Sequence, residues 1–305
     1  MKWVIPDYYN EFRCIASACR HSCCVGWEVD IDEATLARYD RVPSPFGKRL
    51  QAHIQRGDCP HFILKEGDRC PFLNGENLCD IYIVLGEDAL CQICADHPRW
   101  RNWFADRLEE GLGLCCEEAA RLLLDHPEPL TWQKLSVEGE ELEGDEDYLA
   151  LLERREELIA LLQNRAKPLQ ERICEAFSLC GISQPNRPFS QDVALLLGLE
   201  HMTPEWPEAL KELEEGEWRQ EWDRDGEHLL CYILSRYYLS WGLERWAEDF
   251  ALLLGDFTLH LLGALYHREE TLTLERRVEL VRLWSAELEY NEDNLEALGD
   301  YLLQI

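Results

Sequence analysis

The residues best suited to chemistry in this chain are its cysteines, most of which are crowded into the first part of the sequence. The 305 residues include 14 cysteines, and eleven of these lie between Cys14 and Cys116. The eleven are Cys14, Cys19, Cys23, Cys24, Cys59, Cys70, Cys79, Cys91, Cys94, Cys115 and Cys116. The first residues lack the apolar core of a secretion signal, so we expect a cytoplasmic protein with reduced thiols. Dense thiols in a reducing compartment predict a metal or cluster site.

The spacing of these thiols also favours a metal. Ten of the eleven, all but Cys59, form four short groups: Cys14-x4-Cys19-x3-Cys23-Cys24, Cys70 with Cys79, Cys91-x2-Cys94, and Cys115-Cys116. Four thiolates complete either a tetrahedral zinc site or an iron–sulfur cluster. The chain has eight or more candidate thiols, which is more than one such site needs. Either two metals bind, or several thiols lie beside the ligands without contacting the metal. Spacing alone leaves zinc and an iron–sulfur cluster both open.

An acidic stretch divides the chain. Between residues 138 and 147, seven of ten residues are Asp or Glu and two are glycines. Such a stretch has no apolar face to bury, so we expect an exposed linker that proteases reach easily. The predicted organisation is a cysteine-rich metal-binding region at 1–137, an acidic linker at 138–147 and an α-helical domain at 148–305. The expected fold class is mainly α, with short helices and loops of the cysteine-rich region packed on a helical bundle.

Periodicity and capping residues predict the individual elements. In the first region Asp32 can cap a helix from Glu33 towards Tyr39, residues 117–124 form a second helix, and alternation at 27–31 indicates a short strand. In the second region apolar stripes predict helices at 151–162, between Pro168 and Gly181, and at 229–246, 250–266, 272–290 and 295–303. No run approaches 18 uncharged apolar residues, so no membrane span is predicted. Neither a tandem repeat nor a parallel-sheet pattern is found.

Charge narrows the choice of partners. Asp and Glu number 60 against 30 Lys and Arg, which gives a formal charge of -30. Nucleic acid is therefore not expected as a partner, because phosphate binding depends on clustered Lys and Arg. An acidic surface suits a basic, lysine-bearing protein partner, although solubility accounts for it equally well.

Several motifs resemble a known family. Phe12-x-Cys14, Cys19, Cys23-Cys24, Cys70-Pro71-Phe72-Leu73, Cys79-x-Ile81-Tyr82 and Cys94-x-x-His97-Pro98 resemble the cysteine-rich zinc- or iron-chelating domain. Longer segments, at 14–27, at 114–121 and from Leu162 to Arg172, resemble the flagellin lysine-N-methylase family. The resemblance therefore extends over most of the chain.

The resemblance implies both ligands and an activity. The metal-binding positions that it implies are Cys14, Cys19, Cys23, Cys24, Cys70, Cys79, Cys94 and Cys116, whereas Cys59, Cys91 and Cys115 are additions in this chain. The implied activity is methyl transfer from S-adenosylmethionine to lysine side chains of flagellin, with an iron–sulfur cluster (4Fe-4S) or zinc as the metal cofactor. The catalytic residues are not readable from the sequence.

Two common methyl-donor motifs are missing. A Rossmann methyltransferase has a glycine-rich turn after a strand, and Gly111-x-Gly113 lacks the third glycine. A radical enzyme has C-x3-C-x2-C, and here Gly26 stands where the third cysteine would be. The alternative function is therefore a non-catalytic module in which zinc or iron stabilises a protein-interaction surface.

A few other side chains are candidates for the site. Arg99 could hold the carboxylate of the methyl donor, and Trp100 could face its sulfonium through a cation–π contact. Alternatively, Arg99 forms a structural ion pair and Trp100 belongs to the hydrophobic core. His97 could bind the metal, or it could orient a metal ligand through a hydrogen bond. Arg236 and Tyr237 could contact the substrate, or they could belong to a buried hydrogen-bonded cluster.

Overall fold

The computed structural model describes residues 1–137, 142–245 and 247–304, and it divides into two compact units. One, which we call the helical unit, contains Met1–Phe12, Trp100–Cys115 and Ala119–Ile305. The other, the cysteine-rich unit, contains Arg13–Arg99 and Cys116–Glu118. The division differs from the boundary expected at 137, because both ends of the predicted cysteine-rich region belong to a sheet of the helical unit.

That sheet has four strands in the order β4-β5-β1-β6. The strands are β1 (Lys2–Pro6), β4 (Arg99–Trp103), β5 (Arg107–Leu112) and β6 (Trp132–Ser136). Strand β1 pairs in parallel with β5, with Trp3 opposite Leu108, and antiparallel with β6, with Trp3 opposite Leu135. The parallel pairing was not expected from the sequence. The two strands lie about a hundred residues apart in the sequence, and neither contains an alternating pattern that would predict it.

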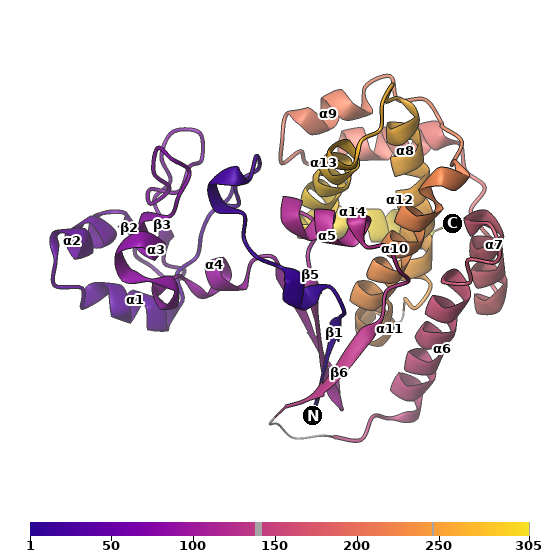
Figure 1. Ribbon diagram of the computed structural model, residues 1–305, viewed down its shortest axis with the longest axis horizontal. Helices are drawn as coiled ribbons and strands as arrows, with labels where there is room; N and C mark the ends of the chain where they lie inside the picture. Colours follow the sequence, from indigo (N-terminus) through magenta and orange to yellow (C-terminus); the bar gives the residue numbers. More distant parts are fainter. Residues whose placement is uncertain (138–141, 246, 305) are drawn as a thin grey trace. The chain divides into compact units, whose positions relative to one another are not determined.

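Helices make up most of the helical unit (Figure 1). They are α5 (Glu117–Asp125), α6 (Glu146–Leu162), α7 (Leu169–Cys180), α8 (Phe189–Gly198), α9 (Glu205–Leu210), α10 (Asp223–Ile233), α11 (Leu239–Arg245), α12 (Phe250–His267), α13 (Leu274–Trp284) and α14 (Glu292–Leu303). Two π-helical turns, η5 (Leu234–Tyr238) and η6 (Ser285–Glu289), follow α10 and α13. The mainly α class is thus confirmed, and Gly181 ends α7 in the left-handed conformation as predicted.

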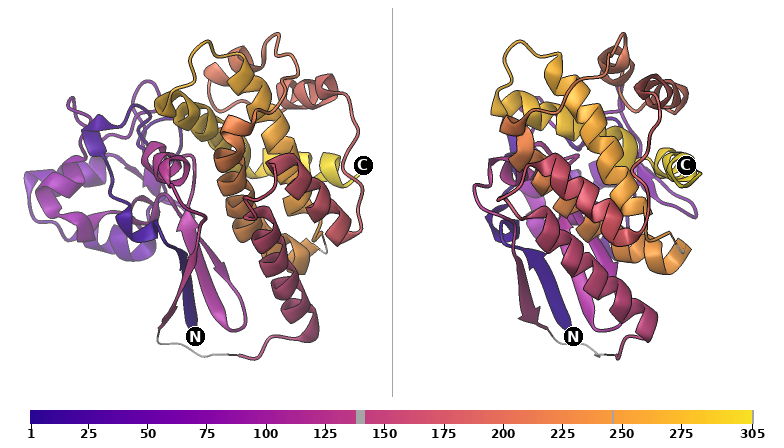
Figure 2. Two further views of the ribbon diagram at one scale, coloured as in Figure 1. Left: turned by 45° about the vertical axis from the view of Figure 1, so that its right-hand side comes forward. Right: turned by 90° about the vertical axis from the view of Figure 1, so that its right-hand side faces the viewer.

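Helix α12 forms the centre of this unit. It is long and apolar enough to cross a membrane by length and composition, but 89% of its apolar window is buried inside the structure. Its apolar surface is therefore used in packing against other helices, in particular α10 and α14. Helix α6 lies against the sheet, where Arg155 donates two hydrogen bonds of 2.6 Å to Glu109 in β5 (Figure 2).

The acidic linker is shorter than predicted. Residues 138–141 lie outside the described part of the chain. Asp145 caps α6 by accepting a hydrogen bond of 2.9 Å from the backbone N–H of Tyr148. Glu146 and Asp147 therefore belong to the helix, because acidic residues are favourable in the first turn of a helix.

The cysteine-rich unit is built from short elements. They are η2 (Ala16–Ala18), α1 (Glu33–Asp40), α2 (Pro45–Ala52), β2 (Ile54–Gln55), β3 (His61–Phe62), α3 (Asp80–Leu85), η3 (Glu87–Ala89) and α4 (Gln92–Asp96). In its core the ring of Phe62 stacks on that of Tyr39 and lies tilted against that of Phe72. The prediction of a strand at 27–31 is wrong. In this segment Asp30 makes an isolated bridge with His61.

Asp32 joins two of these helices. One carboxylate oxygen accepts from the backbone N–H of Thr35 in α1, and the other accepts from that of Gln92 in α4, each at 2.9 Å. Burial would raise the pKa of Asp32, but the two N–H groups lower it below its ordinary value. The sequence predicted the first cap but not the second.

We predict that Asp32→Ala lowers the free energy of unfolding by about 1–2 kcal/mol, because both helix ends lose an acceptor. Urea unfolding of wild type and variant would measure this loss. Asp32→Asn keeps one acceptor oxygen and should lose less. Since the folded-state pKa is lowered, the contribution is present above the unfolded value, ~3.9, and disappears as the pH falls. Equal stability of Asp32→Ala and wild type at pH 7 would contradict the double cap.

Candidate metal centre

Five cysteines line the inside of the cysteine-rich unit, and we call them the inner thiol group: Cys24, Cys70, Cys79, Cys91 and Cys94. Cys70 and Cys91 are buried in the hydrophobic core, and Cys24, Cys79 and Cys94 pack against it. Four of the five are among the positions predicted to bind metal. The fifth, Cys91, was classed as an addition, although the Cys91-x2-Cys94 spacing could have signalled it.

Backbone pairing brings this group together. The N–H of Cys70 donates to the carbonyl of Cys24 at 2.9 Å, next to an antiparallel bridge between Val25 and Arg69. A second bridge, between Leu73 and Cys79, closes the loop that follows Cys70. Cys79 then caps α3, and Cys91 and Cys94 stand at the start and within α4. Residues separated by 70 positions therefore converge through short local pairings.

The thiols of the inner thiol group also affect one another's pKa values. Burial raises the pKa of Cys70 to about 11, and the charges of Cys24 and Cys79 add to the rise. A hydrogen bond to Cys91 raises the pKa of Cys94, which also faces Cys24 and Cys70. Thiols with raised pKa values carry protons near neutral pH, so a metal that binds them has to displace those protons.

A second set of four cysteines, the outer thiol group, contains Cys14, Cys19, Cys23 and Cys116. Cys14 and Cys23 are exposed, and Cys19 and Cys116 are half-buried. A hydrogen bond to Cys24 raises the pKa of Cys23, and the charges of Cys14 and Cys116 raise it further. The same bond lowers the pKa of Cys24 to about 7. The adjacent pair Cys23-Cys24 thus contributes one thiol to each group.

Other side chains line the outer thiol group. The Cys19 thiol lies 3.8 Å from a carboxylate oxygen of Glu117, and burial raises its pKa above the ordinary value. The same carboxylate accepts hydrogen bonds of 3.0 Å from Arg20. Glu117 therefore ties the segment after Cys116 to the loop around Cys19.

The remaining cysteines lie elsewhere. Cys59 is exposed and lines a separate cavity. Cys115 belongs to the helical unit, where its thiol interacts with Tyr290. Cys174, Cys180 and Cys231 are on helices of that unit. These five cysteines are not among the metal-binding positions that the family resemblance implies.

In the described part of the chain, no three sulfur atoms of the inner thiol group all lie within 4.8 Å of one another. With Zn–S bonds of about 2.3 Å, four tetrahedral thiolates lie ~3.8 Å apart. Among the described residues, three metal-binding side chains have ligand atoms within 4.8 Å of one another, and they are Glu28, Asp30 and His61. This trio contains no thiol. A polynuclear cluster bonds its thiolates to different metal ions and accepts a wider spacing. The donor chemistry of the thiols fits zinc and an iron–sulfur cluster alike.

The residues suggested for the methyl donor occupy structural positions. Arg99 donates to the carbonyl of Ala95 at 3.4 Å, at the end of α4. Trp100 lies on strand β4, with its ring so close to Gly111 that a Cβ there would come within 2.4 Å. Its indole N–H is buried and has no hydrogen-bond partner among the described residues.

His97 follows α4 directly. Burial, and then the charge of Arg99, lower its pKa to about 4, so the ring is neutral at physiological pH. Its ring centroid lies 6.2 Å from that of Trp27. A neutral imidazole retains a lone pair, so His97 keeps the chemistry of a ligand or of a support for one.

A buried polar cluster lies at the two π-helical turns of the helical unit. The Glu289 carboxylate accepts from Tyr237 at 2.8 Å, from Ser285 at 2.5 Å and from Tyr232 at 3.0 Å. Arg236 pairs with the same carboxylate at 3.1 Å. Tyr237 thus belongs to a buried hydrogen-bonded cluster, one of the two alternatives stated for it, and its partner is a glutamate about fifty residues away. The network is internally satisfied, which suits a structural role.

Fold and site together define a mainly helical protein with a cysteine-rich unit whose thiols gather in two groups. Comparison with curated proteins gives 25% identity over 146 residues to the lysine-N-methylases of Salmonella typhimurium and Salmonella choleraesuis. It gives 26% over 136 residues to the flagellar biosynthetic protein FliU of Salmonella muenchen. The matches cover 43% and 41% of this chain, 35% of the length of the two lysine-N-methylases, and 78% of FliU. No protein-family model and no solved structure matches the chain.

Proposed function

We propose that this protein is an S-adenosylmethionine-dependent lysine N-methyltransferase that acts on flagellin-like proteins and carries an iron–sulfur cluster. The observation that supports it best is the similarity to lysine-N-methylases, found in a chain whose cysteine-rich unit gathers two groups of thiols. The similarity is distant and covers about a third of those relatives. The methyl donor, the metal and the substrate are therefore part of the proposal.

The inner thiol group is the proposed cluster site. Cys24, Cys70, Cys79 and Cys94 would hold it, with Cys91 as a further thiol beside Cys94. The outer thiol group, Cys14, Cys19, Cys23 and Cys116, would hold a second metal. When bound, a cluster supplies electron transfer or an open iron position, depending on its ligands. The apolar packing around Cys70 and Cys91 restricts water, which favours retention of a cluster.

The chemistry of the reaction limits where it can take place. A lysine amine attacks the methyl group of a sulfonium only in its neutral form, so its pKa has to fall from ~10.4. Nearby carboxylates would raise that pKa, whereas an apolar or aromatic pocket would lower it. The reacting amine therefore has to be kept away from the strongly acidic parts of the surface.

The proposal is tested by incubating anaerobically purified, metal-replete protein with methyl-labelled S-adenosylmethionine and flagellin. We expect label on lysine side chains, and loss of labelling with the Cys70→Ala variant but not with Cys174→Ala. Flagellin whose lysines are acetylated should stay unlabelled. If flagellin stays unlabelled with fully loaded wild-type protein, the methyltransferase is rejected and the non-catalytic interaction module takes its place.

A further inference from the structure

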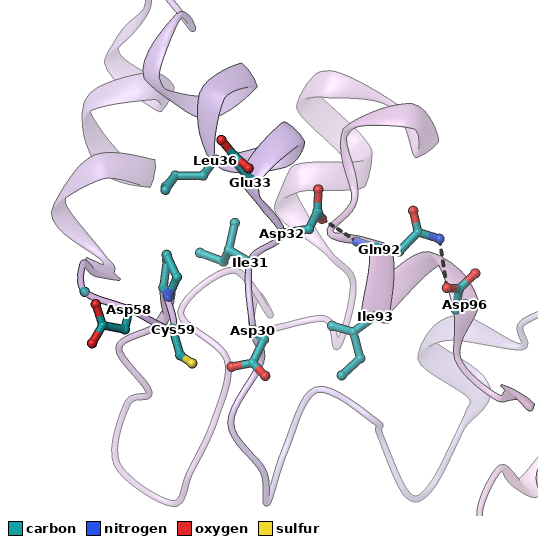
Figure 3. A pocket seen from close by; sticks show the side chains of 12 residues that line it. Asp30, Ile31, Asp32, Glu33, Leu36, Asp58, Cys59, Gln92, Ile93 and Asp96 are labelled. Carbon is teal, nitrogen blue, oxygen red and sulfur yellow. Dashed lines mark hydrogen bonds between the residues drawn. The ribbon is translucent and has the colours of Figure 1, made fainter.

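The cysteine-rich unit contains a cavity of about 820 Å³ that none of the arguments above uses (Figure 3). Its floor is apolar and is made by Ile31, Leu36, Pro60 and Ile93. Its rim carries five carboxylates, which belong to Asp30, Asp32, Glu33, Asp58 and Asp96. None of the 12 lining residues is a lysine or an arginine. The cavity is thus an apolar groove with a uniformly negative rim.

Two of the rim carboxylates are held in place by one side of the groove. Gln92 donates its backbone N–H to Asp32 and its side-chain amide to Asp96, at 2.9 and 2.8 Å. By contrast, Glu33 and Asp58 are exposed, and within the described part of the chain neither forms an ion pair. Glu33 and Asp58 therefore present negative charge that no ion pair in the described part of the chain neutralises.

A second cavity shows that this charge pattern is not general. The other cavity, of about 570 Å³, lies in the helical unit and is lined by four glutamates but also by Arg268 and Arg276. Arg276 pairs with Glu269 at 2.7 Å. The lining of the second cavity thus combines both signs of charge, whereas that of the first contains no lysine or arginine, although both lie in a chain of net charge -30.

The groove matches the chemistry of a lysine side chain. A lysine carries a four-carbon apolar stem and an ammonium head, and it buries the stem while the head remains at a polar rim. Ile31, Leu36 and Ile93 can contact the stem, and Glu33 and Asp58 can pair with the head. A small anion or a nucleotide phosphate would be repelled by the same rim.

We propose that this groove docks a lysine-bearing segment of the protein substrate. The choice of a polypeptide substrate as the occupant rests on the function proposed above. The docked lysine is not the one that reacts, because the five carboxylates would raise its pKa and keep it protonated. The groove instead holds a neighbouring lysine, and so sets which part of the substrate reaches the catalytic site.

The test measures binding separately from methylation. A fluorescent peptide of alternating alanine and lysine is titrated with the metal-replete protein, and the affinity is compared with that of a double variant, Glu33→Gln with Asp58→Asn. We expect the double variant to bind the peptide three- to tenfold more weakly than wild type, which corresponds to the loss of about two exposed ion pairs. The affinity of wild type for the peptide should also fall in high salt. The matched control, Glu205→Gln with Glu208→Gln, removes the same charge from the second cavity and should bind as wild type. In the methylation assay the groove variant should raise the KM for flagellin.

Each outcome bears on one proposal. Equal affinities of the groove variant and wild type, or an equal loss in the control, would overturn the docking inference. Displacement of the peptide by stoichiometric Mn²⁺ would overturn it as well, because it would assign the groove to a cation near Glu28, Asp30 and His61. Groove-dependent peptide binding without methyl transfer would retain the docking site and reject the methyltransferase.

Discussion

Cys70→Ala should empty the inner thiol group of metal, whereas Cys174→Ala should leave the metal content unchanged. Cys70 is buried, it is bonded through its backbone to Cys24, and its neighbours Cys24 and Cys79 are candidate ligands too. Cys174 is exposed on α7, with its thiol 3.4 Å from the amide oxygen of Gln184. A metal site needs all its ligands, so one missing central thiol should remove most of the bound metal.

The measurement is an analysis of iron, sulfide and zinc after anaerobic purification, together with the visible spectrum. Wild type is expected to contain iron and sulfide and to absorb in the visible range. Because metal binding contributes to folding, on the order of 10 kcal/mol for structural sites, the Cys70→Ala variant should also unfold at a lower urea concentration. Zinc without sulfide in the wild type would keep the ligands and reject the cluster.

The two thiol groups should also be separable. Cys14→Ala should remove the metal of the outer thiol group and leave that of the inner one, since Cys14 is exposed and faces Cys23 rather than Cys70. If Cys231→Ala empties the sites while Cys70→Ala does not, the assignment of the ligands to the cysteine-rich unit is wrong. Cys231 is buried in α10, where burial raises its pKa.

Local signals in the sequence proved more readable than distant ones. The Asp32 cap, the Gly181 helix end and the helices of the second region depend on residues within a few positions, and the structure has them where they were expected. The sheet was missed because β1 and β5 pair across a hundred residues, and neither strand carries an alternating pattern of its own. The same distance explains why the second role of Asp32, as an acceptor for Gln92, could not be predicted.

The candidate site shows the same limit. The number of thiols predicted a metal, but not which thiols face one another. The partition of Cys23 and Cys24 into different groups results from the pairing of residues 24–26 with 68–70, which no spacing rule contains. Cys91 was set aside because it did not match the family pattern, although its burial and its hydrogen bond with Cys94 place it in the inner group.

Glu227→Ala should destabilise the helical unit by about 3–5 kcal/mol, because it leaves a buried guanidinium without its counter-charge. Glu227 lies on α10 and is fully buried. Its carboxylate accepts from Arg172 on α7 at 2.8 Å and from Arg165 at 2.9 Å. Arg172 also donates to the carbonyl of Leu162 at the end of α6. Glu227 therefore holds together three helices of the unit through one carboxylate.

The matched control is a surface ion pair. Arg245 and Glu296 lie 2.7 Å apart, but their side chains are 46% and 55% exposed. Water already solvates both charges, so Glu296→Gln should cost less than about 1 kcal/mol. Thermal and urea unfolding of the Glu227→Ala, Glu227→Gln and Glu296→Gln variants would measure the differences. Glu227→Gln keeps the shape and removes the charge, so most of the loss should remain. If Glu227→Gln and Glu296→Gln lower the free energy of unfolding by similar amounts, burial does not make the loss of the Glu227 charge more costly, and the prediction is wrong.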